Sequence, residues 1–135
     1  MSLLLKHDWS DATVAWEEDH LQMAIAQRLK QLEDARGDFT FAAGLEGLAC
    51  SSKREAGRMK LMGMRAGEVD VRVYLLGGRL LQIEVKIADI GRLLDAQKER
   101  HALLRRLGFE VVELWAATPQ DAADQAERLV LERLA

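Results

Sequence analysis

The fold is decided by the stretch from Gly67 to Ile87, which reads GEVDVRVYLLGGRLLQIEVKI. Apolar and polar residues alternate from Val69 to Leu76 and again from Leu80 to Ile87, and Gly77-Gly78 separates the two runs. Alternation with a period of two is typical of strands that bury one face, and paired glycines are typical of a tight turn. The stretch therefore predicts a β-hairpin.

The two faces of this hairpin differ in chemical character. One face is apolar and comprises Val69, Val71, Val73 and Leu75 of the first arm with Leu81, Ile83, Val85 and Ile87 of the second. The other face carries Asp70, Glu84 and Lys86, because successive side chains of a strand point to opposite sides. A solvated strand does not require two carboxylates and an ammonium group to converge, so these three residues form a candidate site.

The pairing of the two arms tests this arrangement. A two-residue Gly-Gly turn would pair Leu76 with Arg79, and Asp70 would then face Val85. Polar side chains would lie opposite apolar ones, because a shift of one residue turns a strand over. Matching faces require paired numbers with an even sum. The pattern therefore predicts an odd-length loop or a bulge at Gly77-Gly78, with a glycine at positive φ.

Metal-assisted cleavage of a phosphodiester bond is the chemistry that fits the polar face. Carboxylate oxygens of Asp70 and Glu84 are hard ligands suited to Mg²⁺ or Mn²⁺. Such an ion activates a water molecule and offsets charge on the phosphate. Lys86 lies two residues after Glu84, points to the same side and is placed to assist the water. The structural alternative is an exposed Glu84–Lys86 ion pair, which is a common surface feature.

The order of these residues resembles the PD-(D/E)xK nuclease superfamily, in which an aspartate precedes Glu-x-Lys by the length of a hairpin. The run from Gly57 to Asp70, with Lys60-x-x-Gly63 and Gly67-x-x-Asp70, is similar to the VRR-NUC family of virus-type replication and repair nucleases. The resemblance covers roughly residues 16 to 118. Val69 stands where the family usually has proline, which should change the turn and not the metal chemistry.

The resemblance implies roles for individual residues. Asp70, Glu84 and the backbone carbonyl of Val85 would hold the metal, and Lys86 would assist the water and the phosphate. It extends to Glu18 and Gln97, which are further candidates for the catalytic site.

Both further candidates lie on predicted helices. Glu18 borders the inward stripe of a helix expected from Ser10 or Asp11 to about Ala35. Gln97 lies in a helix expected from about Ile90 to Leu107 with Asp89 as its cap, on a face that comprises Leu93, Leu94, Gln97, His101, Leu104 and Leu107. A solvated carboxylate and a glutamine bonded to backbone remain the alternatives. His101 is expected to be a structural histidine outside the site.

The other elements complete an α/β fold. We expect a short strand at 39–42, a helix from Ser52 to about Met62 with a capping box, a central strand at 109–116 and a last helix from Thr118 to about Leu134. Core-filling roles are expected for Met59, Leu61, Met62 and Met64. A strand, helix and strand in this order imply a parallel crossover. The fold class is a mixed β-sheet, with an antiparallel hairpin and a parallel crossover strand, flanked by helices. It matches the α/β/α core that the PD-(D/E)xK resemblance implies.

Composition sets further bounds on the protein. The sequence has 135 residues, which predicts one stand-alone domain, 1–135. Its one cysteine excludes an internal disulfide and a cysteine-rich zinc site, and is compatible with the cytoplasm. The apolar run of residues 3–5 is too short for a signal peptide or a membrane span, so no membrane partner is expected.

Basic residues are concentrated just before the hairpin. The net charge of −3 weighs mildly against nucleic acid as a partner. However, a local cluster of cations beside the candidate site is typical of a track for phosphates. The predicted DNA-binding residues are Lys53, Arg54, Arg58, Lys60 and Arg65.

These observations predict a metal-dependent DNA endonuclease, and its family resemblance favours branched, Holliday-junction-like DNA. Resolution of a four-way junction takes two symmetric cuts, and two sites related by a two-fold axis provide them most simply, so a homodimer is expected. Candidate interface residues are 3–5, Trp9, Trp16 or loop 43–51. One alternative is a catalytically silent DNA-binding subunit of a phage or repair complex. Another is a structural or regulatory protein whose charged face is only solvated.

Overall fold

A computed structural model describes residues 8–44 and 52–135 of the chain. Its elements are α1 (Glu18–Arg36), β1 (Phe39–Ala43), α2 (Lys53–Leu61), β2 (Val71–Leu75), β3 (Arg79–Ile87), α3 (Asp95–Arg106), β4 (Glu110–Ala116) and α4 (Pro119–Leu134). Among the described helices, none is long and apolar enough to cross a membrane.

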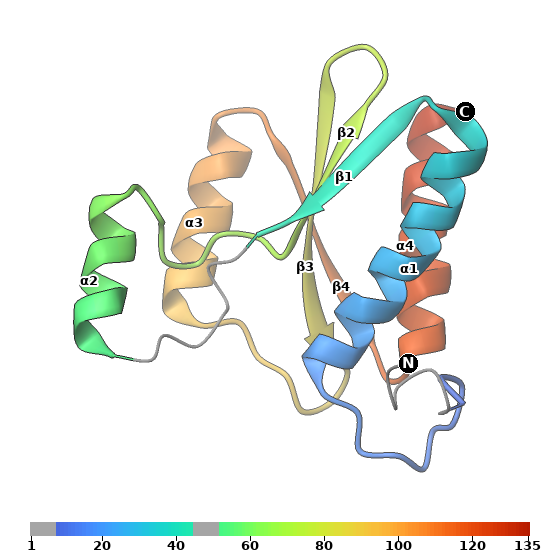
Figure 1. Cartoon of the computed structure of the whole chain (residues 1–135), viewed down its shortest axis with the longest axis horizontal. Coiled ribbons are helices and arrows are strands. Elements are labelled where there is room, and N and C mark those ends of the chain that lie inside the picture. The colour runs from blue at the N-terminus through green and yellow to red at the C-terminus, as the bar shows by residue number, and fades with distance from the viewer. Residues whose placement is uncertain (1–7, 45–51) are drawn as a thin grey trace.

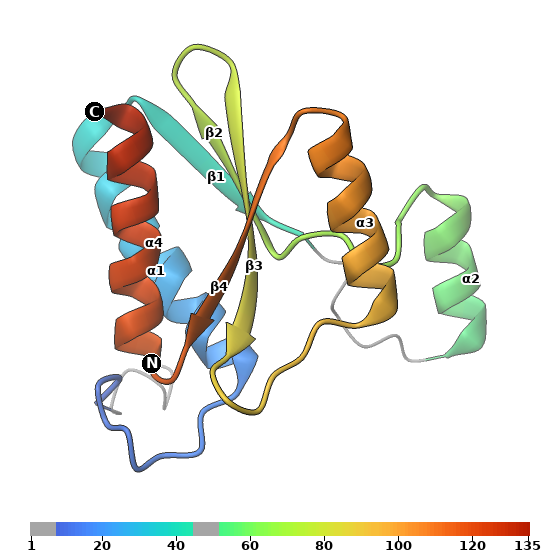
Figure 2. The ribbon, with the colours of Figure 1, turned by 180° about the vertical axis from the view of Figure 1, so that it is seen from behind.

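The four strands form one mixed sheet in the order β1-β2-β3-β4. The β1–β2 and β2–β3 pairs are antiparallel and the β3–β4 pair is parallel. Helices α1 and α4 lie side by side on one face of the sheet, α3 lies on the other face, and α2 lies farther out beyond α3 (Figures 1 and 2). The predicted fold class, a mixed sheet flanked by helices, is confirmed.

The register of the hairpin agrees with the prediction from its polar pattern. Val71 pairs with Ile83 and Leu75 with Arg79, so paired numbers have an even sum and a three-residue loop, 76–78, joins the strands. Gly77 and Gly78 in this loop have φ of +89° and +76°. Glycine adopts this conformation without steric cost, which allows the odd-length loop and keeps the polar residues of both arms on one face.

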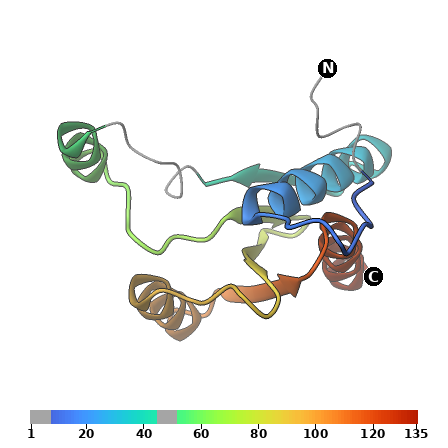
Figure 3. The same ribbon diagram turned by 90° about the horizontal axis from the view of Figure 1, so that it is seen from below.

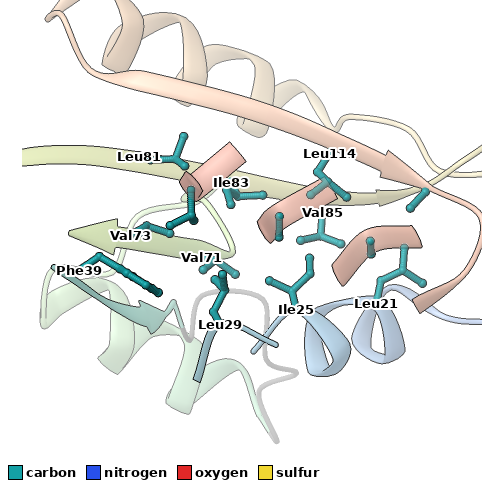
Figure 4. Packing of buried hydrophobic residues seen from close by; sticks show 14 of the residues in the cluster. Leu21, Ile25, Leu29, Phe39, Val71, Val73, Leu81, Ile83, Val85 and Leu114 are labelled. Carbon is teal, nitrogen blue, oxygen red and sulfur yellow. The ribbon is translucent and has the colours of Figure 1, made fainter. Parts of the chain in front are cut away.

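The main core lies between the sheet and the helices α1 and α4 (Figure 4). Its β-strand members are Val71, Val73, Leu75, Leu81, Ile83 and Val85, and α1 contributes Leu21, Ile25 and Leu29. The predicted apolar face therefore packs into this core as expected, except at Val69, which is buried elsewhere. Val69 packs with Leu104 and Val111 in a separate cluster, because β2 begins only at Val71 and strand alternation does not extend to Val69.

Helix α1 begins at Glu18, and the predicted start at Ser10 or Asp11 is wrong. Asp8 accepts hydrogen bonds from the backbone N–H and hydroxyl of Ser10, and Asp11 does the same for Thr13. Such local bonds hold the chain in turns and compete with helix formation. The segment is anchored by Trp16, which is buried in the core, and by Trp9, which is partly buried and packs against the core.

Helix α3 also begins later than predicted, at Asp95. Asp89 has φ of +71°, so it lies in a turn and does not cap a helix. The side-chain oxygen of Gln97 accepts a hydrogen bond from the backbone N–H of Leu94, 2.8 Å away. A glutamine that reaches back three residues to the helix cap marks a helix start. The predicted apolar face is also only partly buried, because Leu94 and Leu107 are exposed.

Strand β4 is an edge strand, and its predicted central position is wrong. Most of its residues are apolar because helices α3 and α4 cover its two faces, and not because strands flank it on both edges. The backbone carbonyls of Val111 and Trp115 accept hydrogen bonds from Arg105 and Gln125, each at 2.9 Å. These side chains satisfy carbonyls that an unpaired edge otherwise presents to another strand.

Helix α2 has the predicted bounds but not the predicted packing. Ser52 caps it by accepting the backbone N–H of Glu55, and Gly63 follows its end with φ of +99°. The helix has no buried residue, and Leu61 and Met62 are 91% and 71% exposed. Their predicted role in the core is therefore wrong, and α2 is an outlying helix with a solvated surface.

Candidate active site

The predicted site residues meet where β3 runs on beyond its pairing with β2. The β2–β3 ladder ends at Val71 and Ile83, so the edge of β3 from Glu84 onward is free to meet Asp70. A carboxylate oxygen of Asp70 accepts the backbone N–H of Val85 at 2.7 Å. The N–H and C=O of one residue leave an extended strand at the same edge, so the carbonyl of Val85 faces the same side as Asp70.

Glu84 is buried beneath α3, with 1% of its surface exposed. Its Oε1 lies 3.1 Å from Nε2 of His101, and its Oε2 accepts a longer hydrogen bond of 3.4 Å from Nε2 of Gln97. Burial, and then the hydrogen bond and charge of Asp70, raise the pKa of Glu84 to about 9. The two acids are thus held against each other in a site of low polarity.

Lys86 is buried on the same face of β3, and its ammonium nitrogen lies 3.7 Å from Oε1 of Glu18. Glu18 is half-exposed in the first turn of α1. Burial raises the pKa of Glu18, and the charge of Asp70 raises it further, against the opposing effect of Lys86. Three acidic side chains therefore lie around the ammonium group of Lys86 at this end of β3. They are Glu18, Asp70 and Glu84.

A cleft of about 650 Å³ opens at this point. It is lined by Glu18, Asp19, Gln22, Met23, Ala26, Gly44, Asp70, Lys86, Leu94 and Gln97. Four of the five residues predicted to be catalytic thus share one cleft, and Glu84 lies beneath it in contact with Gln97.

His101 is the contact that sequence reasoning missed. It was expected outside the site, yet it is 1% exposed and touches Glu84. The available signal was its spacing: His101 follows Gln97 by four residues, so the two side chains lie on one face of a helix. Two polar residues on consecutive turns of an otherwise apolar helical face indicate that the surface packed against them is also polar.

The segment before Asp70 is tied to α3 by an ion cluster. Oε2 of Glu68 lies 3.0 Å from a guanidinium nitrogen of Arg100 and 3.5 Å from one of Arg72. Burial raises the pKa of Glu68, but the hydrogen bond from Arg100 and the nearby charges outweigh it, so the pKa is lowered. Glu68 therefore remains ionised and holds the Asp70 segment beside α3.

The fold is similar to that of a solved structure described as a VRR_NUC domain protein. The TM-score is 0.62 at 21% sequence identity, over 87% of this chain and 91% of that chain. The chain has the fold of a VRR_NUC domain protein. No family model and no curated protein matches the sequence. The likeness confirms the fold that the sequence resemblance implied.

On this VRR_NUC fold, the five predicted DNA-binding residues lie away from the cleft. They are exposed on α2 and on the segment that follows it, on the α3 side of the molecule (Figure 3). Arg54 and Arg58 line a second hollow of about 540 Å³ with Ser52 and Glu55. Four of these basic residues are gathered on α2 and Arg65 follows it, and none of the five lines the cleft around Lys86.

The donor set fits a magnesium-type ion better than a zinc-type ion. Within residues 8–44 and 52–135, no group of three or more His, Cys, Asp or Glu side chains is arranged to hold a metal. Mg²⁺ is commonly bound through one or two carboxylates and completes its shell with water. Asp70 and Glu84 supply two such carboxylates, and a divalent cation would offset the burial and the repulsion by Asp70 that raise the pKa of Glu84.

Proposed function

We propose that this chain is a metal-dependent DNA endonuclease that hydrolyses phosphodiester bonds. The observation that carries the proposal is that Asp70 and Lys86 line one cleft with Glu84 directly beneath it, on a fold similar to that of a VRR_NUC domain protein. A surface ion pair, the structural alternative, does not require Glu84 and Lys86 to be buried as they are here.

Asp70, Glu84 and the carbonyl of Val85 would hold Mg²⁺ or Mn²⁺. The N–H of Val85 already fixes one oxygen of Asp70, which leaves the other oxygen free of this bond. When bound, the ion would lower the pKa of a coordinated water and offset charge on the phosphate.

Lys86 would orient the attacking water and stabilise negative charge on the phosphate as the bond breaks. Its ion pair with Glu18, which also lines the cleft, would help to position the ammonium group there. Glu18 would act as a further acid beside the ion. Gln97 donates to Glu84 and would thereby restrict rotation of that carboxylate.

The DNA would run from the cleft toward α2, whose exposed cations would bind phosphates. We further propose that the substrate is branched, Holliday-junction-like DNA, and that a homodimer makes two symmetric cuts. Because Trp9 and Trp16 pack within the chain, the interface would use other surfaces.

A cleavage assay tests the proposal. Linear, flap and four-way DNA are incubated with the protein in Mg²⁺, in Mn²⁺ and in excess chelator. We expect metal-dependent cutting, greatest on the four-way substrate. Asp70→Asn and Glu84→Gln should abolish cutting and leave DNA binding largely intact. Asp19→Asn is the matched control, because it removes a similar charge from the rim of the same cleft.

Full activity in either ligand variant would refute the site assignment. Tight DNA binding without cutting under every condition would instead favour the catalytically silent DNA-binding subunit.

A further inference from the structure

A buried histidine lies between two carboxylates under α3, and the proposed reaction does not use it. His101 has 1% of its surface exposed. Its Nε2 lies 3.1 Å from Oε1 of Glu84, and its Nδ1 lies 3.7 Å from Oε1 of Glu113. Glu84 and Glu113 are partners in the β3–β4 register, so both side chains point to the same face of the sheet. His101 therefore separates two acids on neighbouring strands.

Glu84 is held at both of its oxygens from one helix. His101 faces Oε1 and Gln97 donates to Oε2, and the two are one turn apart on α3. Gln97 is itself fixed, because its side-chain oxygen accepts the N–H of Leu94. Each carboxylate oxygen offers two lone pairs, so one hydrogen bond to each still leaves capacity for a cation.

The far side of His101 is also restrained. Nη2 of Arg105 lies 3.4 Å from the oxygen of Glu113 that faces Nδ1, and it also donates to the carbonyl of Val111. The imidazole is therefore confined between Glu84, Glu113 and the helix that carries it. Such confinement directs Nε2 at Glu84, which has no other described partner at Oε1.

We propose that His101 is a positioning residue that orients the carboxylate of Glu84 toward the divalent cation, an inference that rests on the proposed function. When Glu84 is ionised, as a metal ligand must be, Nε2–H of His101 donates to Oε1 and prevents the carboxylate from rotating. Hydrogen-bond partners of ligating carboxylates typically contribute 10- to 100-fold to metal affinity or activity. Loss of the donor should therefore weaken cation binding even though His101 does not touch the ion.

Three substitutions separate this role from simple filling of the core. His101→Leu fills the space without a donor. His101→Asn is polar, but its amide ends near the position of Nδ1 and does not reach Glu84. His101→Gln extends an amide N–H to the position of Nε2. Binding of Mn²⁺ to the full chain is measured by electron paramagnetic resonance of the free ion, and thermal melting in chelator verifies that each variant is folded.

We expect about tenfold weaker Mn²⁺ binding in His101→Leu and His101→Asn, and recovery to within about threefold in His101→Gln. If His101→Leu does not fold, the comparison of the asparagine and glutamine variants decides. Wild-type affinity in His101→Asn, or equal weakening in all three variants, would overturn the inference. If the wild-type protein binds no Mn²⁺ and cuts no DNA, the proposed function itself fails, and the inference fails with it.

Discussion

Gly67 lies directly against the first turn of α3, at Ala96. A Cβ atom on Gly67 would stand 2.2 Å from the carbonyl oxygen of Ala96 and 2.7 Å from the backbone nitrogen of Gln97. Gly67 also has φ of +79°, which disfavours any L-residue with a side chain. Because Asp70 follows three residues later, this contact sets the spacing between the segment that carries Asp70 and the helix that carries Gln97. It gives a physical reason for the Gly-x-x-Asp pattern.

Gly67→Ala should therefore destabilise the fold and displace the site. The left-handed backbone costs about 1–2 kcal/mol for alanine, and the overlap with α3 adds to this. We expect a loss of at least about 2 kcal/mol in the free energy of unfolding, measured by urea denaturation. Gly57→Ala is the control, because it lies in α2 with no atom within 4 Å of an added Cβ. It should be neutral or gain up to about 1 kcal/mol. Equal stability of the two variants would contradict the role of Gly67.

Glu84→Gln should stabilise the metal-free protein at neutral and alkaline pH. The folded protein holds the pKa of Glu84 at about 9, well above its usual value, through burial and Asp70. The stability contribution of this carboxyl is therefore fully present below about pH 4 and is lost as the pH rises toward 9. In excess chelator we expect Glu84→Gln to be more stable than the wild type by a few kcal/mol at pH 8, and to match it at pH 4.

Addition of Mn²⁺ should reverse this order, because only the wild type gains stability from binding the ion. Melting curves at the two pH values, with and without Mn²⁺, measure both effects. A wild-type protein more stable than Glu84→Gln in chelator at pH 8 would contradict the prediction.

Reversing charges on α2 should weaken DNA binding for all sequences. Arg58 and Lys60 are exposed on α2, away from the cleft. If each neutralises one phosphate, Arg58→Glu with Lys60→Glu should reduce the slope of log affinity against log salt by about 2. The control is the double variant Arg79→Glu with Arg106→Glu, which changes the net charge by the same amount at exposed positions outside α2. It should leave the salt slope closer to that of the wild type. An unchanged slope in the α2 variant would show that DNA lies on another surface.

Sedimentation at micromolar concentration should show a homodimer. Residues 3–5 and most of loop 43–51, which were predicted as interface material, lie outside the described residues. Edge pairing of two β4 strands is disfavoured, because Arg105 and Gln125 occupy the outward carbonyls of Val111 and Trp115. A monomer, with and without four-way DNA, would exclude the dimer and favour an enzyme that nicks one strand.

Local patterns in the sequence were sufficient for the hairpin and for the cluster of charges at its end. Alternation from Val71 to Leu75 and from Leu81 to Ile87 assigns faces, and the need for matching faces requires the odd-length loop at Gly77-Gly78. The shared face of Glu84 and Lys86 follows from the same period, because side chains two residues apart lie on one side of a strand. The hairpin and this shared face depend on neighbouring residues alone, so sequence reasoning reached them. Asp70 precedes β2, and a tertiary contact, the hydrogen bond from the N–H of Val85, holds its carboxylate beside β3.

Packing between distant segments decided the remaining features. The turns at Asp8 and Asp11 delay α1, and contact with α3 moves Val69 into a second cluster. Sequence alone places His101 and Gln97 on one helical face, but only the position of α3 over β3 brings both to Glu84. That position depends on side chains from several elements that fill one space together, and no local period encodes it.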